Sequence, residues 1–137
     1  MAVTSAEFIP HFLESEKPMI MSIRGATTAE NCKKSIIDNT RQLLEEIMKF
    51  NCLEIDQVVS ILFTCTKDLN AAYPAVAARE MGIVHAALMC AQEMDVPGSL
   101  PQCIRVQVTA ATGISQKEAK HIYLKEARGL RPDLLHE

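Results

Sequence analysis

The chain has no long apolar run and no recognisable targeting pattern at its start. No apolar segment reaches the ~18 residues that would suggest a membrane span. The acidic N-terminal region also lacks the basic and apolar parts of a secretory signal peptide. We therefore predict a cytoplasmic protein with no membrane partner.

The chain also has no basic cluster. Its 14 Lys and Arg residues are outnumbered by 17 Asp and Glu, and the net charge is −3 at pH 7. Binding to a phosphate backbone needs a basic face that releases counterions. The composition thus predicts that nucleic acid is not a partner.

Cys-x-x-Cys spacing is absent as well, and the cysteines are five, an odd number. Neither a disulfide framework nor a zinc site is indicated, and the four histidines show no paired ligand spacing. We predict reduced thiols, no metal and no cofactor. The cysteines are Cys32, Cys52, Cys65, Cys90 and Cys103.

A length of 137 residues suits a single domain. Residues 1–18 mix acidic, polar and apolar residues without a sustained period, and Pro18 would interrupt a helix running into the next segment. We predict a flexible N-terminal extension over residues 1–18 and one domain over residues 19–137.

Periodicity after residue 18 predicts alternating strands and helices. The first strand, residues 19–23, is expected to end at a turn permitted by Gly25. A long helix is expected to start at a capping box, Thr27 to Glu30, and to run to about Asn51.

The rest of the chain follows the same alternation. Residues 57–65 are β-branched and apolar, as in a buried strand, while Pro74 and Gly82 bound a short helix. Further strands are expected at 85–90, 103–109 and 121–127, with one helical turn at 115–120. This order predicts an α+β or α/β fold, in which helices pack on one face of a sheet. The other face of that sheet must then also be covered.

Arg105 interrupts the predicted strand 103–109. Burying an arginine among Ile and Val is costly unless it is paired, so an inward Arg105 implies an anionic partner or ligand. Other arginines at element ends, with nearby Tyr, Cys and Glu, can supply hydrogen bonds to a small polyanion. These candidates are Arg24, Arg79, Arg131, Tyr73, Cys90, Glu93 and Tyr123.

Six motifs follow one another between Ser22 and Leu134. They are Ile23-Arg-Gly-Ala-Thr-Thr, Ala72-Tyr-Pro-Ala, Ala78-Arg-Glu, Cys90-Ala-Gln-Glu-Met-Asp-Val, Cys103-Ile-Arg-Val, and His121-Ile-Tyr-Leu with Leu130-Arg-Pro-Asp-Leu. In these motifs the chain resembles the monofunctional chorismate mutases of the trimeric α/β-barrel class. The resemblance implies an α+β fold, a mixed β-sheet with helices packed on one face. It also implies a homotrimer that forms a pseudo-α/β-barrel (chorismate mutase/YjgF-like) with interfacial active sites.

The resemblance implies the Claisen rearrangement of chorismate to prephenate, in aromatic amino acid biosynthesis, with neither metal nor cofactor. By resemblance, Arg105 is the cation beside the breaking ether bond. Glu93 accepts a hydrogen bond from the ring hydroxyl, and Cys90 contacts the same hydroxyl. The implied binding residues are Arg24 and Tyr123 at the carboxylates, Met89, Tyr73 and Leu130 along the pocket, and Arg79 and Arg131 at its rim.

The chain departs from the family pattern at Val76, where a lysine is usual, and at Met89, where threonine is frequent. Two other functions stay open. One is a non-catalytic trimer that binds a small carboxylate, although both Arg105 and Glu93 are present. The other is a deaminase of similar architecture that acts on enamines or imines, for which Glu93 would have to activate water.

Overall fold

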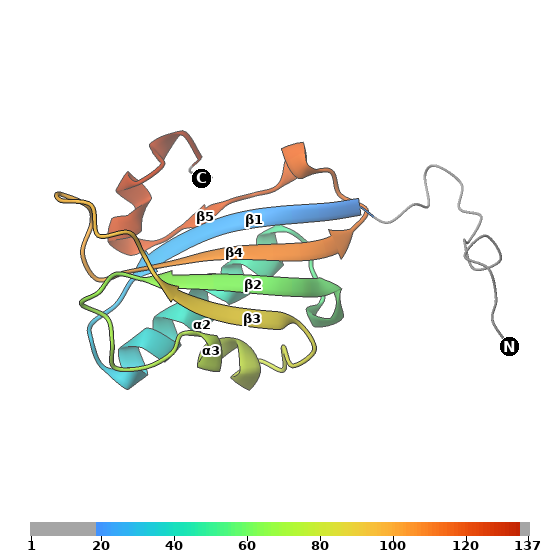
Figure 1. The fold of residues 1–137 in the computed structure, drawn as a ribbon. Coiled ribbons are helices and arrows are strands. Elements are labelled where there is room, and N and C mark those ends of the chain that lie inside the picture. The colour runs from blue at the N-terminus through green and yellow to red at the C-terminus, as the bar shows by residue number, and fades with distance from the viewer. Residues whose placement is uncertain (1–18, 135–137) are drawn as a thin grey trace, which may run out of the picture.

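A five-stranded mixed sheet with the order β3-β2-β4-β1-β5 forms the centre of the fold (Figure 1). The computed structural model describes residues 19–134. The predicted extension, residues 1–18, lies outside the described residues. β4 pairs antiparallel with β1 and β2, whereas β2–β3 and β1–β5 are parallel pairs. The strands are β1 (Met19–Thr28), β2 (Val58–Cys65), β3 (Ala87–Gln92), β4 (Cys103–Thr112) and β5 (Ile122–Tyr123).

Two α-helices, α2 (Lys33–Phe50) and α3 (Ala75–Glu80), pack on one face of this sheet, and α2 lies behind it in Figure 1. The predicted α+β class and the one-sided helix layer are therefore confirmed. Short 3-10 helices complete the described chain, and none of its helices is long and apolar enough to cross a membrane. The 3-10 helices are η2 (Ile55–Gln57), η3 (Gln116–Glu118), η4 (Lys125–Gly129) and η5 (Pro132–Leu134).

The core lies between the helices and the sheet. Along β4, the residues at even positions from Ile104 to Ala110 are buried, while the odd positions from Arg105 are more exposed. Strand side chains alternate between faces, so β4 places Arg105 on the face that the helices leave open. Phe63 of β2 is fully buried and, with Leu43 and Ile47 of α2, belongs to the main cluster.

Gly25 does not form the predicted turn. It lies within β1, opposite Val106 of β4 and Ile122 of β5. A Cβ at this position would lie 2.8 Å from Cδ1 of Ile47 and 3.1 Å from the carbonyl oxygen of Ile122. Glycine is therefore needed here because α2 and β5 approach β1 closely, rather than because the chain reverses.

The predicted capping box at Thr27 is also wrong. Thr27 and Thr28 continue β1, and the pairing with β4 extends as far as Thr28 opposite Cys103. The helix begins only at Lys33, with Cys32 at the N-cap and no side-chain cap. Strand pairing and burial of Thr27 outweigh the local capping signal, because a cap contributes only about 1 kcal/mol.

The other predicted strands and helices are present in the structure, and they differ from the predictions mainly in where they begin and end. Strand 57–65 and the helix between Pro74 and Gly82 are confirmed, and Gly82 has φ of +92° where that helix ends. The last strand was predicted too long, since β5 has only two residues. Lys125 has φ of 54°, which is incompatible with an extended strand, and it is the first residue of η4.

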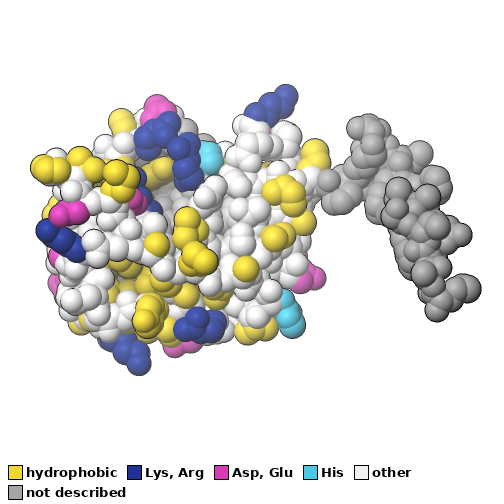
Figure 2. Space-filling model, viewed as in Figure 1, with side chains coloured by type: hydrophobic (Ala, Val, Ile, Leu, Met, Phe, Trp, Pro, Cys, Tyr) yellow, Lys and Arg dark blue, Asp and Glu magenta, His cyan; other side chains and the backbone are white. Residues whose placement is uncertain are grey.

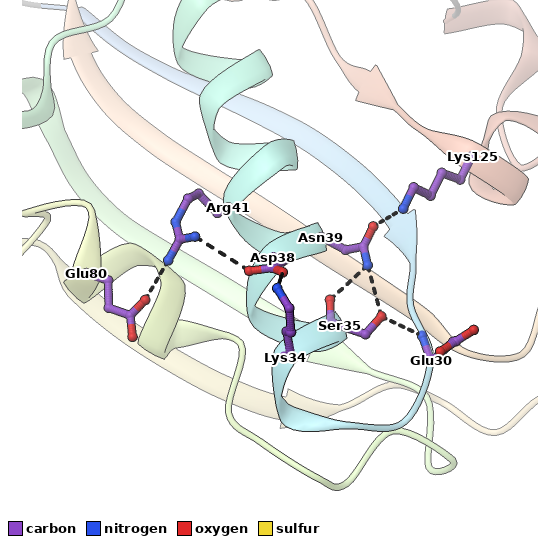
Figure 3. Close-up of polar contacts among 8 residues, drawn as sticks. All are labelled: Glu30, Lys34, Ser35, Asp38, Asn39, Arg41, Glu80 and Lys125. Carbon is purple, nitrogen blue, oxygen red and sulfur yellow. Dashed lines mark hydrogen bonds and ion pairs between the residues drawn. The ribbon is translucent and has the colours of Figure 1, made fainter.

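Polar contacts hold α2 to its surroundings (Figure 3). Arg41 donates to Glu80 of α3 at 2.5 Å, while Lys34 pairs with Asp38 at 2.7 Å. Asn39 donates to the backbone oxygen of Ser35 at 2.8 Å and accepts a hydrogen bond from Lys125. The Arg41 and Lys125 contacts link the first half of the helix to α3 and to the chain that follows β5, whereas the other two lie within α2.

Candidate active site

A cavity of about 280 Å³ opens on the helix-free face of the sheet. Its floor is formed by β2, β4 and β1, and its walls come from the chain after β3 and from the C-terminal region. Several of the residues predicted from the sequence line it together, although they are far apart along the chain. They are Arg24, Glu93, Arg105, Tyr123 and Arg131.

Arg105 lies near the start of β4, the central strand of the sheet, opposite Thr64 of β2 and Ala26 of β1. Its side chain is 42% exposed, but its Nε atom is buried. Among residues 19–134, that Nε is the one buried side-chain nitrogen or oxygen without a hydrogen-bond partner. The nearest opposite charge is Oε2 of Glu93 at 3.5 Å, which is too long for a well-formed hydrogen bond.

Glu93 is held on both oxygens. Its Oε2 accepts a hydrogen bond from the Thr64 hydroxyl at 2.9 Å, and its Oε1 accepts one from the backbone N–H of Met94 at 3.0 Å. The backbone N–H of Glu93 donates to the carbonyl of Cys65 at 2.9 Å. The carboxylate thus forms an ion pair with Arg105 in a defined orientation, without a well-formed hydrogen bond to its Nε.

The other cations come from the end of the chain and from β1. Arg24 follows Ile23 in β1, and its backbone N–H donates to Nδ1 of His121 at 2.9 Å. Arg131 donates to Asp133 through Nε at 3.1 Å and through Nη2 at 2.9 Å. These hydrogen bonds raise the pKa of Arg131 and lower the pKa of Asp133. The lining of the cavity therefore carries three guanidinium groups and one carboxylate, which suits an anionic ligand.

The other half of the predicted site lies elsewhere in the single chain. Cys90 and Tyr73 line a separate cavity of about 480 Å³. Cys90 stands opposite Phe63 in the β2–β3 pairing and packs against the core, on the helix-covered side. The structure does not bring it to Arg105. Three further predicted residues are also outside the cavity: Arg79 is exposed on α3, Met89 is exposed on β3, and Leu130 packs near Tyr123.

Burial governs the thiols in this region. It raises the pKa of Cys65 to about 12, and the neighbouring Cys90 and Cys103 add to that shift. Burial also raises the pKa of Cys103, although the Arg105 guanidinium opposes the change. In the described part of the chain, no three His, Cys, Asp or Glu side chains are grouped so that they could hold a metal ion.

Sequence reasoning missed several lining residues, including Thr64, Gln107 and Leu62. A signal was present, because Arg105, Gln107 and Thr109 alternate with apolar residues along β4. That alternation predicts which side chains share a face. The partner on β2 needed the strand register, which pairs Thr64 with Arg105 and Leu62 with Gln107.

Fold and cavity together describe an α+β protein with an arginine-lined cavity on the open face of its sheet. The family model described as chorismate mutase type I matches residues 20–134. The chain is 45% identical over 118 residues to chorismate mutase AroH of Bacillus subtilis (strain 168), a match that covers 85% of this chain and 93% of that protein. It is 42% identical over 118 residues to chorismate mutase AroH of Thermus thermophilus, covering 85% and 97%.

A solved structure agrees with these matches. The chorismate mutase from Clostridium thermocellum superposes with a TM-score of 0.77 and 50% identity, covering 79% of this chain and 97% of that one. The chain belongs to the type I chorismate mutase family.

Proposed function

We propose that the cavity around Arg105 binds chorismate and catalyses its rearrangement to prephenate. The activity is that of the family: the chain is a chorismate mutase, an intramolecular isomerase. What we add is the assignment of the site and of the role of each residue. The observation that carries it is the buried Nε of Arg105, which has no hydrogen-bond partner among residues 19–134 and lies in a cavity lined by further cations.

Arg105 supplies the electrostatic part of catalysis. In the rearrangement the ether bond breaks ahead of complete carbon–carbon bond formation, so negative charge grows on the ether oxygen. A preorganised donor aimed at that oxygen binds the transition state more strongly than the substrate. A buried N–H without an acceptor costs free energy, so we infer that an acceptor atom of the substrate forms the hydrogen bond with this Nε.

Glu93 acts on the ring side of the substrate. Its carboxylate accepts a hydrogen bond from the ring hydroxyl and balances the positive character that develops on the ring. Both of its oxygens are already oriented by Thr64 and Met94, so little reorganisation is needed when substrate binds.

Arg24, Tyr123 and Arg131 hold the two carboxylates. Their contribution is positional, because the enolpyruvyl side chain must be kept folded over the ring in a conformer that is rare in water. Every step so assigned uses charge and position, and we propose that no metal or cofactor takes part.

We further propose a homotrimer with its active sites between copies. The open face of the sheet carries Ile20, Leu62 and Met89, which are 59%, 39% and 67% exposed. Figure 2, seen from the same side as Figure 1, shows hydrophobic side chains across this face. The helices cover only the opposite face of the sheet, and a further copy of the chain would bury the exposed apolar side chains of this one. Such a neighbour would also bring Cys90, Tyr73, Met89 and Arg79 to the cavity. A cytoplasmic location remains our prediction.

The test is loss of chorismate ultraviolet absorbance with purified protein and no added metal or cofactor. Prephenate is confirmed by its acid conversion to phenylpyruvate. We expect Arg105→Ala to lower kcat by on the order of a hundred- to a thousandfold or more. Arg128→Ala, which removes an exposed arginine outside this cavity, is the matched control. An Arg105→Ala enzyme as fast as the wild type would refute the assignment, and sedimentation equilibrium would test the trimer.

A further inference from the structure

We infer that Thr64 is a positioning residue for catalysis, whose hydroxyl holds Glu93 short of Arg105 and so keeps the Arg105 Nε–H available to the substrate. The inference rests on the proposed function, because it matters only if Arg105 and Glu93 act on chorismate.

The three side chains meet on one face of the sheet. Thr64 and Arg105 are direct cross-strand neighbours in the β2–β4 pairing, so their side chains leave the sheet on the same side. The Thr64 hydroxyl donates to Oε2 of Glu93 at 2.9 Å. The same oxygen lies 3.5 Å from Nε of Arg105. One carboxylate oxygen is therefore shared between a close hydroxyl and a more distant guanidinium.

The second oxygen of Glu93 is fixed independently, by the backbone N–H of Met94 at 3.0 Å. With a donor on each oxygen, the carboxylate cannot rotate towards Arg105 without losing a hydrogen bond. The Arg105 Nε consequently stays buried beside the opposite charge of Glu93 without a hydrogen bond to it.

Loss of the hydroxyl would remove that restraint. A carboxylate this close to a guanidinium tends to close to a charge-assisted hydrogen bond of about 2.8 Å. Glu93 would then occupy the Arg105 donor and leave the position from which it meets the ring hydroxyl. Since the Arg105 contact strengthens as charge develops on the ether oxygen, the loss should fall mainly on kcat rather than on KM.

Thr64 differs from the other threonines on this face. Thr109 lies on β4 on the same side of the sheet, and its hydroxyl is 3.2 Å from the Ser22 hydroxyl. It does not line the cavity around Arg105. Thr109→Val thus removes a half-buried hydroxyl from the same face and serves as the matched control.

The experiment compares Thr64→Val, Thr64→Ser and Thr109→Val by steady-state kinetics, with melting temperatures to establish folding. For Thr64→Val, which keeps the shape and removes the donor, we expect kcat to fall about tenfold with a smaller change in KM. Thr64→Ser should restore kcat to within about twofold of the wild type, as should Thr109→Val.

A second background separates positioning from general structure. In a Glu93→Ala enzyme, Thr64→Val should cause almost no further loss, because the group it orients is gone. An unchanged kcat for Thr64→Val, a Thr64→Ser variant as slow as Thr64→Val, or fully additive losses with Glu93→Ala would each overturn the inference. If Arg105→Ala and Glu93→Ala are themselves fully active, the proposed site is wrong. If those two variants are slow and Thr64→Val is not, only the role of Thr64 is wrong.

Discussion

Asp133 accepts two hydrogen bonds from Arg131, one from Nε at 3.1 Å and one from Nη2 at 2.9 Å. The contact occupies one edge of the guanidinium and leaves the Nη1 edge for another anion. Arg131 lines the cavity, so Asp133 orients a group that we assign to a substrate carboxylate.

Replacement of Asp133 by Asn should weaken this orientation. Both side chains are exposed, and exposed ion pairs contribute little, so we expect KM to rise only about two- to fivefold with kcat nearly unchanged. Asp95→Asn, which breaks an exposed pair with Lys67 at 2.8 Å, is the control. A lower KM in Asp133→Asn would instead mean that Asp133 competes with the substrate.

The Arg131–Asp133 ion pair should persist only above the pH at which Asp133 becomes protonated. Its hydrogen bonds lower the pKa of Asp133 from 3.8, so the ionised form is favoured in the folded protein. Any stability from the pair is present above that value and is lost as the pH falls below it. Assays near neutral pH therefore measure the intact pair in the wild type.

Gly25→Ala should destabilise the protein. The added methyl group would meet Cδ1 of Ile47 at 2.8 Å and a backbone oxygen of Ile122 at 3.1 Å, and the second of these cannot move without shifting β5. Overpacking of this type costs about 1–3 kcal/mol. Urea denaturation measures it against Gly113→Ala, where nothing lies within 4 Å of the added atom. Equal stability of the two variants would contradict the close approach of α2 and β5.

Asn51 joins the end of α2 to the chain before β5. Its amide donates to the carbonyls of Ile47 at 2.8 Å and Lys120 at 2.9 Å, and its Oδ1 accepts from the N–H of Lys120 at 2.8 Å. Because the residue is buried, Asn51→Ala leaves polar groups without partners, and we expect a loss of about 2–3 kcal/mol in the free energy of unfolding. The control is Asn31→Ala. The exposed Asn31 side chain accepts hydrogen bonds from the backbone N–H groups of Asn70 and Ala71, so its replacement should lower the free energy of unfolding clearly less.

The exposed thiols should be alkylated before Cys65. Burial raises the pKa of Cys65 to about 12, so this thiol stays protonated at pH 8. Cys32 and Cys52 are exposed. Since the thiolate is the nucleophile, iodoacetamide at pH 8 should label Cys32 and Cys52 well before Cys65, as read by peptide mass spectrometry. Labelling of Cys65 at the same rate would show that its surroundings are more open than the structure indicates.

Local patterns predicted the elements whose signals agree with their tertiary setting. The β-branched run of β2 and the proline-to-glycine boundaries of α3 are examples. Prediction failed where a local signal competed with pairing, as at Thr27, where β1 continues against β4. It also failed at Gly25, since glycine can mean either a turn or a close approach and only the packing of Ile47 distinguishes the two.

The sequence alone determined the fold class and the family resemblance and predicted the candidate site residues, because these inferences depend on residue types in a fixed order. Only the tertiary structure decided which of them meet. Strand register sets Thr64 against Arg105, and the β2–β3 pairing turns Cys90 towards the core. The physical reason is that a face of a sheet collects side chains from strands distant in sequence, and no local pattern encodes that register.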